Sequence, residues 1–287
     1  MPGLVVRITV TGASGFVARH LRGHLLQNGV DTVSISRNNF ALLKGEQKII
    51  SQDYEKGVLS GIRGSDALIH LVGIGRQSVQ NRYGTVNTGI TENVIRLCKK
   101  AGIKRIIYLS GLGVSSGTQL EYFISKYNAE QMIKKSGLDY VIFRPSYIVG
   151  GDDPLSCHLK KQIKNKVIEI PGSGRYSFQP IHIGDVAQIL LDSATKGRFR
   201  NKTLDLVGPE RITFGKYVRL FSPKTRIQKI DLEKAYHTAM TSPGQEPGVD
   251  DLNIMVGSFE GNHEKLADTA GIKFQSVVNI LKSGRLF

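Results

Sequence analysis

The chain has 287 residues, 40% of them hydrophobic, which is enough to bury a sizeable core and excludes a domain too small to fold alone. No apolar run approaches the roughly 20 residues of a membrane span, and the first strand begins almost at once, so we expect a cytoplasmic protein with neither a transmembrane segment nor a signal peptide. The formal net charge of +15 favours anionic partners, but no nucleic-acid-reading module accompanies it, and we expect no nucleic acid among them.

The first element is a β-rich run over residues 4–10, followed at once by Thr11-Gly-Ala-Ser-Gly-Phe-Val-Ala18. A strand that turns sharply into a helix presents the helix's unpaired N–H groups and positive dipole end, where an anion can bind. Gly12 allows the tight turn, Gly15 lets a phosphate approach the backbone, and the small Ala18 lets the helix pack closely on the strand. This G-x-x-G-x-x-A spacing directly after an apolar strand predicts a site for the pyrophosphate of a dinucleotide.

Strands and helices alternate through the first half of the chain. One helix is expected over residues 16–28, where Gly29 stops it, and another over 85–101, closed by Gly102. The strands are expected near residues 4–10, 31–36, 47–51, 67–72, 105–110 and 140–144. Parallel strands joined by helical crossovers predict an α/β fold with a doubly wound parallel sheet, the Rossmann architecture.

The pattern is less regular in the second half of the chain. The elements expected there are strands at 167–170 and 202–207 and a helix at 183–193. We therefore predict a dinucleotide-binding Rossmann domain over residues 1–150, which also recruits about 180–208, and a small C-terminal lobe made mainly of residues 151–287. The variable lobe is expected to set the specificity for a substrate or partner.

Two cysteines, Cys98 and Cys157, fall in different predicted helices and have no C-x-x-C spacing. This usage predicts neither a disulfide framework nor a zinc site. We expect both residues to be buried thiols.

The end of the second strand, Ser34-Ile-Ser-Arg-Asn38, distinguishes between the two nicotinamide dinucleotides. NAD-binding sheets usually place Asp or Glu there to accept the ribose 2'-hydroxyl. The guanidinium of Arg37 can instead pair with a 2'-phosphate, and Ser36 and Asn38 add hydrogen-bond donors. The sequence thus favours NADP(H) over NAD.

Tyr122 and Lys126 lie four residues apart in a segment expected to be helical, so they share one face of it. A phenol with a pKa near 10 is a poor base at neutral pH, but an adjacent cation stabilises the phenolate. Lys126 can supply that cation and can also donate to the ribose hydroxyls of a nicotinamide nucleotide. Because the pair follows the strand at 105–110, whose end faces the expected cleft, we interpret it as a proton-transfer pair. A structural tyrosine beside a surface lysine is the alternative.

Further motifs accompany these in a fixed order between residue 4 and about residue 207. They are Asp66-Ala-Leu-Ile-His-Leu-Val72, Asn87 with Thr91 and Asn93, Tyr108-Leu-Ser110, Tyr122-x-x-Ser-Lys126 with Glu130, Arg144-Pro145 and Pro180-Ile-His-Ile-Gly-Asp-Val-Ala187. Together they resemble the extended or atypical short-chain dehydrogenases/reductases. Within that superfamily the sequence is most similar to the NAD-dependent epimerase/dehydratase-like group, which includes NmrA-like proteins and the nucleotide-binding accessory subunit of respiratory complex I.

The resemblance implies a set of cofactor contacts spread along the chain. They are Thr11, Gly12, Ser14, Gly15, Phe16 and Val17 at the pyrophosphate, Arg37 at the adenosine phosphate, Asp53 near the adenine, Leu71 and Val72 beside the ribose, and Pro145 and Ile148 beside the nicotinamide. It further implies that Asn87 supports the central helix and that Tyr122 and Lys126 are the acid/base pair. His182 and Asp185 match an element at the base of the substrate lobe, and we interpret them as structural.

One position departs from the family pattern. Active members carry a Ser or Thr directly after Ser110, where its hydroxyl holds the substrate oxygen against the tyrosine, but this chain has Gly111. Ser110 itself is the first candidate to supply the missing hydroxyl. Ser115, Ser116 and Thr118 are further candidates.

Two hypotheses of function follow. The first is an NADP(H)-dependent oxidoreductase or epimerase/dehydratase acting on a carbonyl or carbinol of an unknown small molecule, phosphorylated or nucleotide-linked. The second is a non-catalytic NADPH-binding sensor or accessory subunit of a larger complex, which Gly111 and the positive charge favour. The densest basic stretches, 158–166 and 196–202, are suited to a phosphorylated substrate, an acidic protein or a lipid surface.

Overall fold

The computed structural model describes residues 5–55, 57–241 and 247–284, so residue 4 of the first predicted strand lies outside the described part. The chain forms two compact units. The described residues of Met1–Arg144, Gly184–Leu204 and Asp268–Gly271 make up the first unit, and those of Pro145–Ile183, Asp205–Ala267 and Ile272–Phe287 make up the second. None of the helices formed by the described residues is long and apolar enough to cross a membrane.

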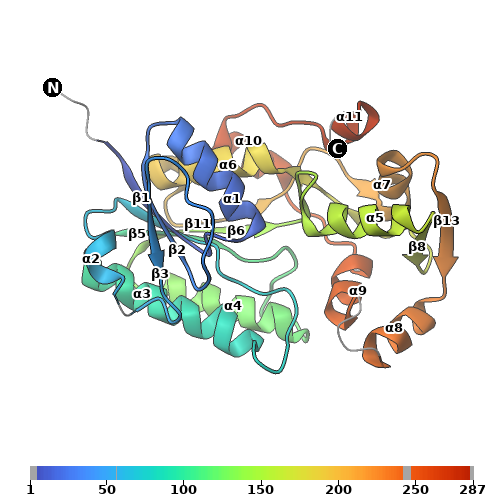
Figure 1. Cartoon of the computed structure of the whole chain (residues 1–287), viewed down its shortest axis with the longest axis horizontal. Coiled ribbons are helices and arrows are strands. Elements are labelled where there is room, and N and C mark those ends of the chain that lie inside the picture. Colours follow the sequence, from blue (N-terminus) through green and yellow to red (C-terminus); the bar gives the residue numbers. More distant parts are fainter. Residues whose placement is uncertain (1–4, 56, 242–246, 285–287) are drawn as a thin grey trace. The chain divides into compact units, whose positions relative to one another are not determined.

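The first unit is built on a seven-stranded sheet in the order β11-β6-β5-β4-β1-β2-β3 (Figure 1). Its strands are β1 (Arg7–Thr11), β2 (Asp31–Ser36), β3 (Glu46–Ile50), β4 (Ala67–His70), β5 (Arg105–Leu109), β6 (Asp139–Pro145) and β11 (Lys202–Leu206). All pairings from β3 through β6 are parallel, and the direction of chain progression reverses between β1 and β4. The predicted doubly wound α/β fold is therefore confirmed, with its switch point beside β1.

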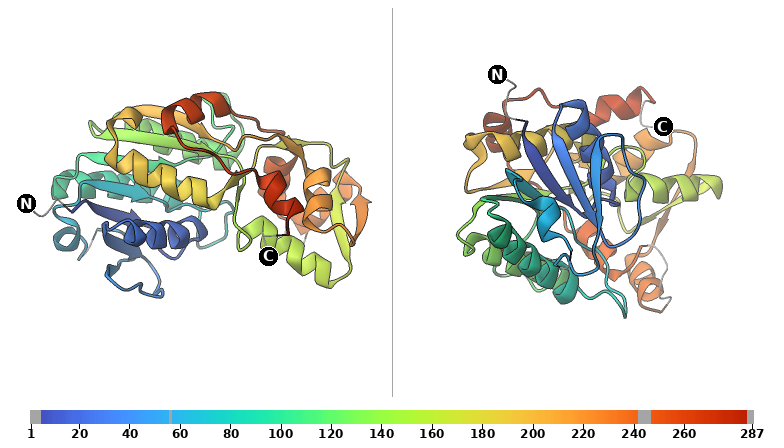
Figure 2. Two further views of the ribbon diagram at one scale, coloured as in Figure 1. Left: turned by 90° about the horizontal axis from the view of Figure 1, so that it is seen from above. Right: turned by 60° about the vertical axis from the view of Figure 1, so that its left-hand side comes forward.

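Helices cover both faces of this sheet (Figures 1 and 2). Helices α1 (Phe16–Gln27) and α6 (Ile183–Thr195) lie on one face, and α2 (Leu59–Ile62), α3 (Ile90–Ala101) and α4 (Glu121–Lys134) lie on the other. Because both faces are covered, β2 and β4 are buried almost throughout. This two-sided burial fits the nearly continuous apolar run of β4, Ala-Leu-Ile-His, whereas β2 buries the polar Thr32, Ser34 and Ser36 together with Val33 and Ile35.

The helix predicted over 85–101 is two structures in succession. Gly84–Gly89 forms a π-helix, and α3 follows it directly. The helix ends as expected at Gly102, which adopts the left-handed conformation with φ +76°. The wider π-helical turn coincides with Asn87, whose side chain is bonded to the backbone of Ile74 and to Ser125.

The second unit consists of short elements around an aromatic core that includes Phe178, Phe214 and Tyr217. Its strands are β7 (Ile148–Val149), β8 (Val167–Pro171), β9 (Ser177–Phe178), β10 (Ile181–His182), β12 (Ile212–Thr213) and β13 (Arg226–Ile230), paired two by two. The remaining helices of the chain are α5 (Pro154–Lys164), η2 (Gly197–Phe199), α7 (Phe214–Phe221), α8 (Leu232–Thr241), α9 (Val249–Val256), α10 (His263–Ala270) and α11 (Val277–Lys282).

The expectation of two buried thiols is wrong for one of them. Cys98 is fully buried in α3, and burial raises the pKa of its thiol to about 12. Cys157 is exposed, because α5 turns Leu155 and Leu159 toward the core and leaves the position between them on the outer side.

A buried ion pair joins α1 to the start of β3. The guanidinium of Arg22 donates to both carboxylate oxygens of Glu46, at 2.5 and 2.6 Å, and also to the carbonyl oxygens of Ala13 at 3.0 Å and Ala41 at 2.7 Å. Burial alone would raise the pKa of Glu46, but hydrogen bonds from Arg22, Ser34 and the Leu43 amide outweigh it, and the pKa is lowered. One arginine thus holds the turn after β1 and the loop after β2 in a single network.

We expect Arg22→Met to lower the free energy of unfolding by about 3–5 kcal/mol, because it leaves the Glu46 carboxylate buried without its partner. The double variant Arg22→Met/Glu46→Leu should recover most of that loss. Since the pKa of Glu46 is lowered on folding, the pair stabilises the protein above the ordinary carboxyl pKa and loses this effect as the pH falls below it. Urea denaturation of the three proteins checks this, and a double variant less stable than the single one contradicts it.

Candidate functional site

The predicted pyrophosphate turn connects β1 to α1. Gly12 adopts φ +74°, and a Cβ added there would lie 3.0 Å from the carbonyl carbon of Leu71 and 3.1 Å from the nitrogen of Val72. The Gly15 amide donates to the Gly12 carbonyl at 2.9 Å, and α1 begins at the next residue. Among described residues no side chain caps this helix, and its first turn contains no acidic residue. The turn is therefore shaped for an anion, because free N–H groups and the positive end of the helix dipole meet there.

Polar side chains at the end of β2 face the same turn. The hydroxyls of Ser14 and Ser36 lie 3.1 Å apart, and the Asn38 amide donates to Ser36 Oγ at 3.3 Å. The Arg37 guanidinium donates to the neutral amide oxygen of Asn81 at 3.2 Å, and within the described ranges it has no carboxylate partner. Its positive charge therefore remains available beside the predicted pyrophosphate turn.

The segment after β3 contains a contact that the sequence did not indicate. Asp53 accepts hydrogen bonds from the Ser51 hydroxyl and the Glu55 amide, as in a turn. Its neighbour Tyr54 is buried in a left-handed conformation with φ +60° and is hydrogen-bonded to the backbone of Gly12. Burial raises the pKa of this phenol, while the charge of Arg37 and the bond to Gly12 oppose the rise. No periodicity or motif marks position 54, so only the tertiary contact identifies it.

A chain of buried polar groups runs beneath the turn. His70 Nδ1 lies 2.8 Å from Thr11 Oγ1 and His70 Nε2 lies 3.1 Å from Thr91 Oγ1, while Thr91 Oγ1 donates to the Asn87 carbonyl at 2.6 Å. Burial, together with the charge of Lys126, lowers the pKa of His70 to about 3. The imidazole is therefore neutral at physiological pH and serves as a hydrogen-bonding link rather than as an acid or base.

Lys126 lies buried in α4 against the ends of β4 and β5. Its Nζ donates to the Leu109 carbonyl at 3.1 Å and stands 5.0 Å from the centre of the Tyr108 ring. A Cβ at Gly73 would come within 2.8 Å of that Nζ, so the absence of a side chain at position 73 makes room for the ammonium. Burial lowers the pKa of Lys126 to about 8, and the charge of Glu130 works against this shift. The group is a cation close to its titration point at neutral pH.

Tyr122 is half-buried one helical turn before Lys126, as predicted. Its ring packs against Tyr83 and Phe123, with centroids 5.6 and 5.1 Å away. We expected a neighbouring cation to lower the pKa of this phenol, but burial raises it to about 12. The physical reason is that the ammonium is directed onto the Leu109 carbonyl and the Tyr108 ring. In this state the phenol is a proton donor at neutral pH.

The position that departs from the family pattern lies directly beside this phenol. A Cβ at Gly111 would be 3.3 Å from Tyr122 Oη. The hydroxyl of Ser110 points elsewhere and donates to Glu130 at 2.6 Å; that buried carboxylate also accepts two hydrogen bonds from Arg144, at 2.9 and 2.7 Å. Gly111 therefore provides no hydroxyl next to the phenol, and the Ser110 hydroxyl is hydrogen-bonded to the Glu130 carboxylate instead.

The other predicted cofactor residues fall in four places. Phe16 and Val17 form the first turn of α1, and Leu71 and Val72 follow β4 and contact Gly12. Asn87 bonds the backbone of Ile74 and donates to Ser125 Oγ at 3.0 Å, so it joins the segment after β4 to α4. Pro145 ends β6 and Ile148 begins β7, and both belong to the second unit.

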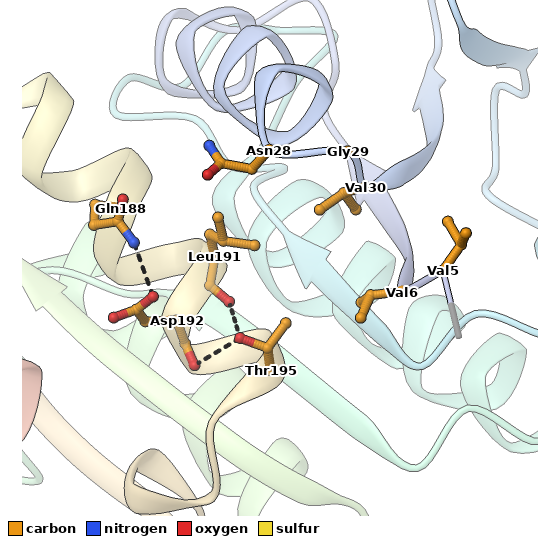
Figure 3. Close-up of a pocket in the computed structure, with 9 residues that line it drawn as sticks. All are labelled: Val5, Val6, Asn28, Gly29, Val30, Gln188, Leu191, Asp192 and Thr195. Atoms are coloured by element: carbon orange, nitrogen blue, oxygen red, sulfur yellow. Dashed lines mark hydrogen bonds between the residues drawn. The ribbon is translucent and has the colours of Figure 1, made fainter. Parts of the chain in front are cut away.

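A cavity of about 470 Å³ lies at the opposite edge of the sheet (Figure 3). Its lining comes from the residues just before β1, from the linker between α1 and β2, and from the end of α6, and comprises Val5, Val6, Asn28, Gly29, Val30, Gln188, Leu191, Asp192 and Thr195. This edge holds the amino ends of the parallel strands. The predicted cofactor residues gather at the other edge, where the strands have their carboxyl ends. The cavity is therefore distinct from the cofactor turn.

Comparison with known proteins agrees with this geometry. Residues 12–196 match a protein family described as NAD(P)H-binding. The chain belongs to this family. The resemblance to the extended short-chain dehydrogenases/reductases that we drew from the motifs is confirmed, and a nicotinamide dinucleotide is the type of cofactor that both the family and the turn indicate.

Curated relatives include both a subunit of an oxidoreductase and a ketoreductase. The mitochondrial 40 kDa subunit of NADH-ubiquinone oxidoreductase from Neurospora crassa is 23% identical over 71% of this chain and 56% of its own length. A 4-hydroxy-2-methyl-3-oxo-4-farnesyl-3,4-dihydroquinoline-1-oxide ketoreductase from Stigmatella aurantiaca is 26% identical over 67% of this chain and 65% of its own length. The chain thus spans less than two thirds of either relative.

The fold is shared with a UDP-glucuronic acid 4-epimerase from Bacillus cereus, solved in complex with UDP-glucuronic acid and NAD. The TM-score is 0.75 with 18% identity, and 98% of each chain is covered. At this level of identity the likeness concerns the fold.

Two glycines with nearly the same backbone angle allow a matched test of the turn. Gly12→Ala should abolish dinucleotide binding, because the new methyl would press on the backbone of Leu71 and Val72. Gly29 has φ +71° and no atom within 4 Å of an added Cβ, so Gly29→Ala should cost only about 1–2 kcal/mol of stability and leave affinity unchanged. Calorimetric titration with NADPH checks both, and equal losses of affinity would contradict this role for Gly12.

Proposed function

We propose that this protein is an NADP(H)-dependent oxidoreductase or epimerase/dehydratase that acts on a carbonyl or carbinol carbon of a small molecule. The observation that carries the proposal is the half-buried Tyr122 phenol, one helical turn from the buried Lys126 ammonium in α4. Helix α4 follows β5, which is separated from β1 and its pyrophosphate turn only by β4 in the sheet. The first unit would bind the cofactor. The second unit would supply the substrate lobe.

The residues of the first unit fit a dinucleotide. The close approach of Gly12 to the segment after β4 and the uncapped start of α1 suit a pyrophosphate. Arg37, with a neutral hydrogen-bond partner and no carboxylate ion pair in the described part of the chain, supports a preference for the 2'-phosphate of NADP(H) over NAD. A carboxylate at this position would instead favour the free ribose hydroxyl of NAD.

When bound, the nicotinamide would supply or accept the hydride of the proposed reaction. Tyr122 donates its phenolic proton to the carbonyl oxygen of the substrate, a role that suits a phenol whose pKa is raised to about 12 by burial. Lys126, which donates to the Leu109 carbonyl, would instead hold the ribose hydroxyls of a bound cofactor, and as a cation it would stabilise the phenolate that remains. The Ser110 hydroxyl either keeps its hydrogen bond to Glu130 and contributes through that carboxylate, or changes rotamer and donates to the substrate oxygen.

The substrate is proposed to be anionic, phosphorylated or nucleotide-linked. The basic stretch at residues 160–166 and Arg175, both in the second unit, supports this class. The solved neighbour described with UDP-glucuronic acid shows that the fold can accommodate such a molecule in another protein.

The alternative function is a non-catalytic NADPH-binding subunit with protein partners. The specific observation in its favour is the environment of Tyr122, where Gly111 brings no hydroxyl and Ser110 is held by Glu130. The respiratory-chain subunit among the relatives also supports it. Cofactor binding would be the same under both functions, because neither the turn nor Arg37 uses the missing hydroxyl.

Arg37 determines the cofactor preference in this proposal. Arg37→Ala should weaken NADPH binding by about ten- to a hundredfold through loss of a charge-assisted contact, and NADH binding should stay the same. Arg63→Ala is the control, since that exposed arginine follows α2 at the other edge of the sheet. Calorimetry with both dinucleotides gives the result, and an unchanged NADPH:NADH ratio would rule out the assigned role.

Turnover is tested at Tyr122 and Gly111. With a panel of carbonyl compounds and nucleotide sugars, Tyr122→Phe should slow loss of the reduced-nicotinamide absorbance by at least about a hundredfold while NADPH affinity is retained. Gly111→Ser should raise the rate, because it supplies the hydroxyl that active family members carry at this position. The substitution should be tolerated, since its Cβ would stand 3.3 Å from the phenol and the tyrosine need shift only a few tenths of an ångström. If the wild type and Gly111→Ser never oxidise NADPH on this panel, the non-catalytic function replaces the enzymatic one.

A further inference from the structure

Three linkers of the first unit bring a dense positive charge to one edge of the sheet. They precede β5, β6 and β11, three neighbours in the sheet, and span residues 99–104, 134–138 and 196–201. Together these linkers hold eight Lys and Arg residues and no Asp or Glu. We name their charged side chains the basic rim. The third linker makes up residues 196–201 of the dense basic stretch found at 196–202 in the sequence.

Hydrogen bonds hold the three linkers side by side. Arg105, at the start of β5, donates to the Lys196 carbonyl at 3.4 Å, and the Asn201 amide donates to the Tyr140 carbonyl at 2.7 Å. Helices α3 and α4, which end in the first two linkers, pack against each other on the same face (Figure 1). The rim is therefore one continuous surface within a single unit.

Part of this charge is used inside the fold. Arg198 and Lys196 pair with Asp192, at 3.2 and 2.7 Å. Arg200 pairs with Asp139 at 2.7 Å, and Lys134 pairs with Glu130 at 3.5 Å. Four exposed lysines have no ion pair among the residues that the structure describes: Lys99, Lys100, Lys104 and Lys135. They stand at the ends of α3 and α4 and just beyond them.

The rim cannot serve the substrate of the proposed reaction. It precedes the strands, whereas the pyrophosphate turn, Arg37 and Tyr122 all follow the strands at the opposite edge. An anion held by the rim is therefore a separate ligand, and it leaves the cofactor turn free.

The chemistry of the rim favours a phospholipid surface over a protein. Its free charges are all lysines, which are depleted at the centre of protein–protein interfaces, and none of the large exposed apolar side chains of the described residues lies in the three linkers. Lysine attracts an anionic bilayer without specific geometry and without an inserted apolar anchor. Such attachment is reversible and weakens with salt.

We propose that the basic rim docks this protein on an anionic phospholipid surface, with the cofactor edge facing away from it. The rim acts through charge alone. It makes no covalent change and requires no change in the cofactor site.

The test is co-sedimentation of the full chain with vesicles of phosphatidylcholine, with and without phosphatidylglycerol. We expect binding only to the anionic vesicles, and we expect Lys99→Gln/Lys104→Gln/Lys135→Gln to reduce it by about tenfold or more. The matched control, Lys216→Gln/Lys224→Gln/Lys229→Gln, removes the same charge from exposed lysines of the second unit and should bind like the wild type.

Two outcomes would overturn the proposal. Equal losses in the two triple variants would mean that overall charge, not the rim, drives attachment. Failure to bind anionic vesicles would exclude the lipid surface, and capture of polyglutamate in that case would favour an acidic polypeptide surface instead. NADPH affinity measured in the same samples separates this test from that of the proposed function, because the rim variant should bind the cofactor normally.

Discussion

The interaction on which the cofactor-facing part of the first unit depends is the buried Arg22–Glu46 pair. One guanidinium is bonded at once to a carboxylate of β3, to the carbonyl of Ala13 in the pyrophosphate turn and to the carbonyl of Ala41 in the loop after β2. Two loops that would contact different parts of a dinucleotide are therefore fixed relative to each other by one charged group. The cost of burying that charge is offset only because the other donors and acceptors around it are satisfied.

A second network extends the same order toward the proposed chemistry. From Thr11 it runs through His70 and Thr91 to Asn87, and from there to Ser125 in α4. Each member is buried, so each would be costly to leave unpaired. The helix that carries Tyr122 and Lys126 is in this way connected to the strand that carries the glycine turn, through side chains that stay neutral at physiological pH.

Features set by neighbouring residues were predictable from the sequence, and features set by distant ones were not. The second strand was expected at the residues that form β2, and Gly29 and Gly102 end their helices as expected, because short β-rich runs and left-handed glycines are local signals. The contact of Tyr54 with Gly12 and the capture of Ser110 by Glu130 join residues far apart in the chain, and no local pattern records them. The pKa of Tyr122 was misjudged for the same reason, since spacing alone does not show where a lysine side chain points.

The π-helical stretch Gly84–Gly89 has a consequence for reading related sequences. A turn of this kind contains more residues than an α-helical turn, and removal of one residue would rotate whatever precedes it by about 100° about the helix axis. Asn87 could not then reach both Ile74 and Ser125. The contacts of Asn87 therefore constrain the number of residues between β4 and α3 as well as their identity. A homologue with an alignment gap there would anchor this loop differently, even if it retains the glycines and the tyrosine.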